Sequence, residues 1–137
     1  ELGDVKRMKL LLDTCCIIWA VSNPDSLSSP AVALLRAEDS EIFVSPISSA
    51  EIACAAKRGR IKLDQHWKTW FRHYIELNQW QLENINLEII EEAYSLPEAF
   101  PSDPVDRIIT ATARIKNYTL LTSDNKILAY PLVNTAW

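Results

Sequence analysis

Four acidic residues stand where a folded chain would gather them into one site. Asp13 closes the apolar run MKLLLD, Asp124 closes the run NYTLLTSD, and Glu51 and Asp106 each lie near the start of an expected helix. Carboxylates brought close together repel one another unless a cation neutralises them or they take up protons. Oxygen ligands suit Mg²⁺ or Mn²⁺, and the sequence offers no Cys/His set with zinc spacing. We therefore predict that Asp13, Glu51, Asp106 and Asp124 are metal ligands and catalytic residues.

A divalent ion held by carboxylates suits the hydrolysis of phosphodiester bonds. Such an ion lowers the pKa of a bound water and neutralises the charge that builds on the phosphate oxygens. Composition excludes ATP, GTP and NAD sites built on glycine-rich loops, because the chain has only two glycines, Gly3 and Gly59. Phosphate-binding loops and dinucleotide fingerprints both need several.

The acids must be positioned by elements that the hydrophobic pattern predicts. Short apolar runs predict strands at 8–13, 41–46, 80–87 and 117–124, with a last strand near Leu132 and Val133. Helices are expected between them, at 14–22, 29–38, 48–58, 64–77, 87–96, 104–115 and 125–130. Strands that alternate with helices predict an α/β fold with a parallel sheet of about five strands and helices on both faces. Asp13 and Asp124 would then share the carboxyl edge of the sheet, where ligands bind.

The stretch SDPVDRIITATARI is the clearest helix in the chain. Asp103 is typical of an N-cap, Pro104 of a first helical residue and Asp106 of a third. The apolar residues that follow predict a buried helix; they are Ile108, Ile109, Ala111, Ala113 and Ile115. We also expect Ser48 and Glu51 to form a capping box and Asp64 to cap the helix after it. Gly59 is expected to end the Glu51 helix in a left-handed conformation.

Each acid also has a purely structural interpretation. Asp13 and Asp124 are suited to capping the helices that follow them, and Asp106 to stabilising a helix N-terminus through the macrodipole. Glu51 would complete its capping box. The metal hypothesis depends on the four acids meeting.

Length and composition indicate one domain of an ordinary folded protein. The chain has 137 residues, 48% of them hydrophobic and 23% charged, with a net charge of −4. The acidic balance argues against strong unspecific binding of nucleic acid. We find neither a signal peptide nor a run of about 18 apolar residues, and expect a cytoplasmic protein without a membrane span. The three cysteines are expected to be buried thiols, with residues 1–7 a leader or a cloning remnant.

Four segments together resemble the PIN-domain ribonucleases, and among them the VapC-type toxins of bacterial toxin–antitoxin pairs. They occur in the family's order: MKLLLDT from Met8, SSAEIACAAKRGRIKL from Ser48, SDPVDRIITATA from Ser102 and LLTSDNKILAY from Leu120. The resemblance covers residues 8–137, which we interpret as a PIN-like nuclease domain.

The resemblance implies a Mg²⁺- or Mn²⁺-dependent endoribonuclease that acts on RNA and is the toxin of a type II system. It carries the family's acids onto Asp13, Glu51, Asp106 and Asp124, and it implies a homodimer and a cognate antitoxin that blocks the acidic pocket. Many close relatives have histidine at the position of Cys15 and another shortly before the DPVDR segment. This chain has Phe100-Pro101-Ser102 in the latter place.

Several other residues admit two interpretations. The basic cluster Lys57, Arg58, Arg60 and Lys62 suits RNA phosphates or a solvated helix end. Arg107 would pair with a structural acid or meet the substrate. Asp103 either assists the core acid or only caps its helix, and Thr122 or Ser123 either adds a hydroxyl to the site or simply ends a strand.

A stripe at helical spacing packs on the sheet or docks an antitoxin or second subunit; it comprises Trp67, Trp70, Phe71, Tyr74 and Leu77. The alternative to an enzyme is a non-catalytic PIN-like module that binds RNA or protein.

Overall fold

The computed structural model describes residues 7–137, so the interpretation of residues 1–7 as a leader lies outside it except at Arg7. The helices are α1 (Thr14–Ser22), α2 (Ser29–Arg36), α3 (Ile47–Lys57), α4 (Trp67–Leu77), α5 (Leu87–Ala93), α6 (Pro104–Lys116) and α7 (Asn125–Leu128), with one 3₁₀ turn, η1 (Pro24–Ser26). The strands are β1 (Met8–Leu12), β2 (Ser40–Val44), β3 (Gln81–Leu82), β4 (Thr119–Leu121) and β5 (Thr135–Ala136). Among these residues no helix is long and apolar enough to cross a membrane.

The five strands form one parallel sheet in the order β3-β2-β1-β4-β5, as the alternating pattern predicts. The central strand β1 pairs on both sides, with Leu11 opposite Phe43 of β2 and Leu120 of β4. Leu10, Leu11 and Leu12 are fully buried, which explains why β1 is an uninterrupted apolar run. All five carboxyl ends therefore lie along one edge of the sheet.

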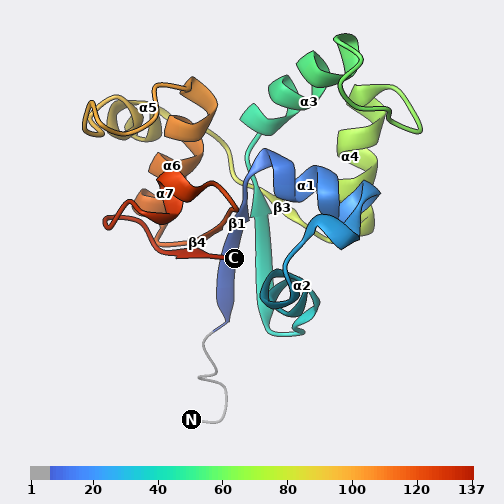
Figure 1. Ribbon diagram of the computed structural model, residues 1–137, viewed down its shortest axis with the longest axis horizontal. Helices are drawn as coiled ribbons and strands as arrows, with labels where there is room; N and C mark the ends of the chain where they lie inside the picture. The colour runs from blue at the N-terminus through green and yellow to red at the C-terminus, as the bar shows by residue number, and fades with distance from the viewer. Residues whose placement is uncertain (1–6) are drawn as a thin grey trace.

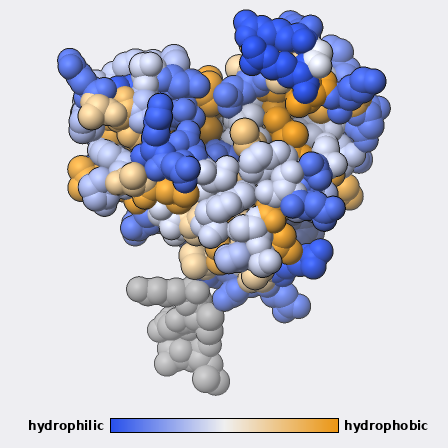
Figure 2. Space-filling view, in the orientation of Figure 1, coloured by the Kyte–Doolittle hydropathy of each residue, from blue (hydrophilic) through white to orange (hydrophobic). Residues whose placement is uncertain are grey.

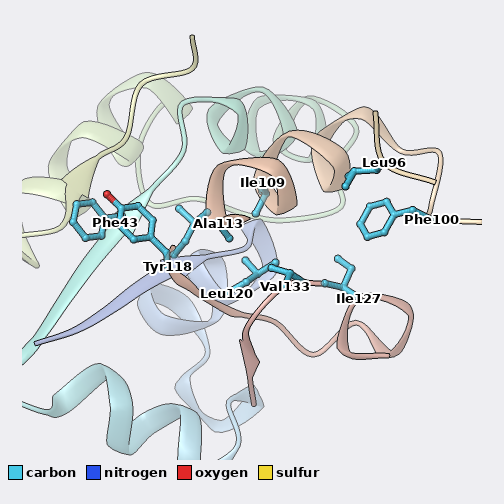
Figure 3. Packing of buried hydrophobic residues seen from close by; sticks show 10 residues of the cluster. Phe43, Leu96, Phe100, Ile109, Ala113, Tyr118, Leu120, Ile127 and Val133 are labelled. Carbon is cyan, nitrogen blue, oxygen red and sulfur yellow. The ribbon is translucent and has the colours of Figure 1, made fainter. Parts of the chain in front are cut away.

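Helices cover both faces of the sheet (Figure 1). Leu11 packs with Ile109 of α6 and Ile127 of α7 in one core cluster, shown in Figure 3. The next residue, Leu12, points the opposite way and packs with Ile17 of α1 and Trp70 of α4 in a second cluster. The two layers rise past the sheet on either side, and the space-filling view shows a hollow between them at the top, beyond the carboxyl edge (Figure 2).

The expected capping box at Ser48 is wrong. Helix α3 begins one residue earlier, at Ile47, because the Ile47 amide donates to Ser45 Oγ at 3.2 Å and Ser49 Oγ donates to the Pro46 carbonyl at 2.7 Å. Ser48 is instead buried and accepts a hydrogen bond from Thr14 Oγ1 at 2.9 Å. Glu51 therefore lies in the second turn of α3 and caps nothing.

Two further boundaries differ from expectation. Helix α4 begins at Trp67 with His66 as its N-cap, and Asp64 accepts a hydrogen bond from the Tyr74 hydroxyl at 2.7 Å instead. Strand β5 lies at Thr135–Ala136, later than Leu132 and Val133, because Thr135 pairs with Leu120. Val133 is buried in the core from the preceding loop.

The cysteines and the α4 stripe are only partly buried. Cys16 is buried and its thiol donates to the Leu121 carbonyl, whereas Cys15 and Cys54 are exposed, contrary to expectation. On α4 Trp70 and Phe71 are buried in the core, which confirms the packing interpretation for them, while Leu77 is 63% exposed.

Candidate metal centre

Asp13 is fixed at the point where β1 becomes α1. Its amide donates to the Leu121 carbonyl of β4 at 3.2 Å, and its Oδ1 accepts from the Cys16 amide at 2.8 Å. The carboxylate is thus the N-cap of α1, as its structural interpretation predicts. The same bonds hold it at the carboxyl edge of the sheet.

Asp124 is held in the same way beyond β4. Its Oδ1 accepts from the Lys126 amide at 2.8 Å and caps α7. Its own amide donates to Thr122 Oγ1 at 3.1 Å. The buried Thr122 hydroxyl therefore supports the turn that places Asp124, which is the strand-end role.

Asp106 is the third residue of α6, as predicted. Asp103 is the N-cap and accepts from the Val105 amide at 2.9 Å, with Pro104 as the first helical residue. The helix beyond is buried from Ile108 to Ala113, so its first turn cannot shift without disturbing the core. Asp106 is half-buried at the inner side of that turn.

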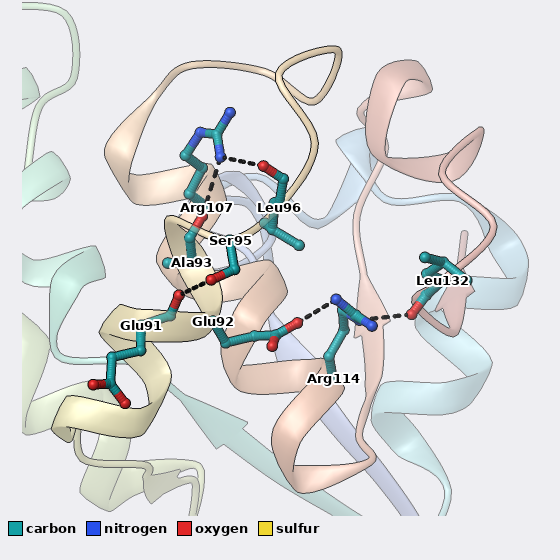
Figure 4. A network of polar contacts seen from close by, with 8 residues as sticks. All are labelled: Glu91, Glu92, Ala93, Ser95, Leu96, Arg107, Arg114 and Leu132. Carbon is teal, nitrogen blue, oxygen red and sulfur yellow. Dashed lines mark hydrogen bonds and ion pairs between the residues drawn. The ribbon is translucent and has the colours of Figure 1, made fainter.

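Arg107 pairs with backbone carbonyls in this structure, and with no acid among the described residues. Its guanidinium donates to four backbone carbonyls at 3.1–3.3 Å, those of Ala93, Leu96, Pro97 and Phe100 (Figure 4 shows the first two). The Ala93 carbonyl is at the C-terminus of α5, where no further helical amide is available. Arg107 therefore ties the α5 end and the following loop to the first turn of α6.

Phe100 belongs to the segment Phe100-Pro101-Ser102, in which the resemblance implies a histidine for many close relatives. Its ring is buried, faces Tyr130 with ring centroids 5.1 Å apart and lies under the Arg107 guanidinium at 5.8 Å. It is a core residue.

The four acids and two neighbours share one electrostatic environment. Burial, then Asp103, Asp124, Glu51 and Asp13 in that order, raise the pKa of Asp106 from 3.8 to about 7. Burial also raises the pKa of Glu51; Thr14 lowers it, and Asp103 and Asp13 raise it. The charges of Asp13, Glu51 and Asp124 are thus all near enough to Asp106 to act on its pKa.

Cys15 and Asp103 belong to the same surroundings; the sequence left an assisting role open for Asp103 and did not select Cys15. Burial and then the charges of Asp13, Glu51, Asp106 and Asp124 raise the pKa of the Cys15 thiol to about 11. Asp103 is the carboxylate with the largest effect on Asp106. Both lie within three residues of a predicted ligand, and this closeness in sequence could have indicated that they belong to the site.

The donor set fits a hard cation. It consists of carboxylate oxygens around a thiol that stays protonated, and two of the carboxyls have pKa values raised by burial and like charge. A cation would relieve both effects. Within residues 7–137 no three His, Cys, Asp or Glu side chains are already close enough to hold a metal ion, so binding requires side-chain movement at the uncapped acids.

The family model of the PIN domain matches residues 10–131, nearly the whole chain. The chain belongs to the PIN domain family. It is 32% identical over 130 residues to Ribonuclease VapC22 of Mycobacterium tuberculosis, covering 93% of this chain and 98% of the relative. The resemblance drawn from the four segments is thereby confirmed.

Solved structures confirm the PIN fold. VapBC2 from Rickettsia felis, bound to a promoter DNA fragment, is 18% identical with a TM-score of 0.68 and covers 95% of this chain and 99% of that one. A toxin–antitoxin complex from Klebsiella pneumoniae is 21% identical with a TM-score of 0.61, covering 93% and 96%.

Proposed function

We propose that this PIN domain protein is a Mg²⁺- or Mn²⁺-dependent endoribonuclease and the toxin of a type II toxin–antitoxin system. The single observation that carries the proposal is that three carboxylates, from the β1–α1 junction, α3 and the β4–α7 turn, all act on the pKa of Asp106 in α6. The identity to a ribonuclease over nearly the full length of both chains supports the choice of RNA as substrate.

Asp13, Glu51, Asp106 and Asp124 would hold the ion. When bound, it supplies an activated water and neutralises charge on the scissile phosphate. The protein contributes positioning: the caps on Asp13 and Asp124 fix both carboxylates before substrate arrives. Helix α6 holds Asp106 rigidly, because the rest of that helix is buried in the core.

A cognate antitoxin and a homodimer are part of the same proposal. The similar structures are toxin–antitoxin complexes, which supports an antitoxin partner. We expect the antitoxin to block the acidic pocket, and a basic side chain has the charge that the raised pKa of Asp106 favours.

The proposal is tested by incubating the protein with RNA in Mn²⁺, in Mg²⁺ and in excess EDTA. Cleavage should require the metal, and Asp106→Asn should abolish it while the circular dichroism spectrum stays unchanged. Equal cleavage in EDTA would refute the metal mechanism. RNA binding without cleavage under every metal condition would favour the non-catalytic alternative. Anomalous scattering from crystals soaked in Mn²⁺ would identify the ligands.

A further inference from the structure

A groove of about 450 Å³ includes the predicted ligand Glu51 in its lining, and no role has been assigned to it so far. Its inner end is formed by Thr14 and Cys15 of α1 and by Glu51 of α3. Val105, in the first turn of α6, closes one side. Because Glu51 belongs to both, the groove and the candidate metal centre are continuous.

One face of α3 forms the floor of this groove. Glu51, Cys54, Ala55 and Arg58 all line it, and their spacing of three, four and seven residues puts them on a single helical face. Seven residues of helix rise by about 10 Å. Arg58, the C-cap of α3, therefore lies well along the groove from Glu51.

The end of α3 brings a second arginine back to the same groove. Gly59 has a φ of 71°, a left-handed conformation that favours glycine. The Arg60 amide then donates to the Ala55 carbonyl at 2.9 Å and the Gly59 amide to the Ala56 carbonyl at 3.1 Å, which is a Schellman motif. The chain thus folds back, and Arg60 lines the groove beside Arg58.

The structure divides the basic cluster into two pairs. The Lys57 ammonium lies over the Trp67 ring, 5.9 Å from its centroid, and Lys62 does not line the groove. Within residues 7–137 the side chains of Arg58 and Arg60 make no hydrogen bond or ion pair. Hydrophilic side chains gather over the outer end of α3 at the top of Figure 2. The two arginines are therefore available to a ligand.

The walls of the groove are apolar and lack aromatic rings. Ile18, Ile61 and Val105 contribute aliphatic side chains. The groove thus combines a cationic rim with an aliphatic interior, and a nucleotide combines a phosphate with an apolar base face. A base can enter only if it is not paired, because pairing and stacking hold bases inside a duplex.

We propose that this groove binds one unpaired nucleotide of the RNA next to the scissile phosphate. Arg58 and Arg60 contact its phosphate, and its base lies against Ile18, Ile61 and Val105. The assignment rests on the proposed nuclease function and makes single-stranded RNA the substrate class. Base selectivity at this position is weak, because the contacts to the base are aliphatic.

The test compares two double variants that remove the same charge, R58A/R60A in the groove and K57A/K62A outside it. Both are made in an Asp106→Asn background that prevents cleavage. Binding of a short mixed-sequence RNA strand, free or annealed to its complement, is measured by fluorescence anisotropy over a range of salt. R58A/R60A should bind the single strand about tenfold more weakly, and its salt slope should fall by about 1.4, or about 0.7 for each lost phosphate contact. K57A/K62A should bind like the parent.

Equal weakening by the two double variants would overturn the assignment, as would duplex RNA bound as tightly as the single strand. Hydrolysis of bis(4-nitrophenyl) phosphate with Mn²⁺ tests the nuclease function separately, since this diester is too small to span the groove. If the diester is hydrolysed while both double variants bind RNA alike, only the groove assignment fails. If it is not hydrolysed and Arg58 and Arg60 still carry RNA binding, the nuclease proposal fails, and the groove remains an RNA-binding site without a scissile phosphate beside it.

Discussion

Replacing Asp106 by Asn should stabilise the metal-free protein at pH 8 while it destroys activity. The carboxyl has a pKa of about 7 in the folded protein against 3.8 ordinarily, so the folded state holds its proton more tightly. The resulting stabilisation is fully present below about pH 3.8 and is lost as the pH rises through 7. At pH 8 the wild type carries an unfavourable buried charge that the neutral Asn variant lacks.

The size of this stabilisation follows from the change in the pKa of Asp106 and from how exposed its side chain is. At about 1.4 kcal/mol for each tenfold change in proton affinity, a rise from 3.8 to about 7 corresponds to about 4 kcal/mol. Asp106 is only half-buried, so solvent screening reduces this to about 1–2 kcal/mol. A chain of this length should melt roughly 3–8 °C higher.

Calorimetry in EDTA at pH 5 and pH 8 measures the effect. The melting temperature of Asp106→Asn should be higher than that of the wild type at pH 8, and most of this difference should disappear at pH 5. Asp39→Asn is the matched control, because Asp39 is an exposed acid in the turn before β2. Asp39→Asn removes the same charge and should leave the melting temperature unchanged at both pH 5 and pH 8. A variant less stable than wild type at pH 8, or an advantage that Asp39→Asn reproduces, would refute the clustering of acids.

Mn²⁺ should make the wild type more stable than Asp106→Asn, the reverse of the order in EDTA. Mn²⁺ at about 100 times its dissociation constant stabilises a binding-competent protein by about 2.7 kcal/mol. The wild type should gain this increment and Asp106→Asn much less, and RNA cleavage by the variant should fall by at least about 100-fold. Equal Mn²⁺ stabilisation of both proteins would mean that Asp106 is not a ligand.

Three further predictions concern the frame around the site. Arg107→Lys should lower the free energy of unfolding by about 2 kcal/mol in urea titrations, because an ammonium cannot serve the four carbonyls that the guanidinium holds; an unchanged midpoint would contradict the clamp. Trp70→Ala should cost about 3–5 kcal/mol by the same measurement, whereas Leu77→Ala, at a 63% exposed position on the same helix, should cost less than about 0.5. Gly59→Ala should cost about 1 kcal/mol through the left-handed φ of 71°, and Gly59→Asn less, since Asn tolerates that conformation; equal losses would place the cause elsewhere.

The fold was predictable because local signals agreed with one another. The run Leu10, Leu11 and Leu12 predicted a strand buried on both faces, and all three side chains are fully buried in β1. The caps at Asp103 and Gly59 were visible in sequence because each depends on a single residue type. Alternating strands and helices then left a parallel sheet as the only simple topology.

The predictions of helix caps were wrong where two nearby residues could each cap a helix and a contact distant in sequence determined which one did. Ser48 matched a capping box, but its hydroxyl binds Thr14, 34 residues away, and Ser45 with Pro46 starts the helix instead. Asp64 was one of two possible caps for α4, and the Tyr74 hydroxyl engages it. The positions of Asp13 and Asp124 were predictable because both follow strands that end at the same edge of the sheet. The position of Glu51 relative to the other acids was not, because it depends on how α3 packs.

The structural and the metal-binding interpretations of the acids are compatible, because a carboxylate has two oxygens. In the described part of the chain, Asp13 and Asp124 each accept a capping hydrogen bond at Oδ1 and none at Oδ2. Capping fixes the orientation of a carboxylate and leaves one oxygen for an ion, as partners of metal ligands do in known sites. Neither Glu51 nor Asp106 has such a capping bond in the described part of the chain, so we expect these two side chains to move more than Asp13 and Asp124 when the ion binds.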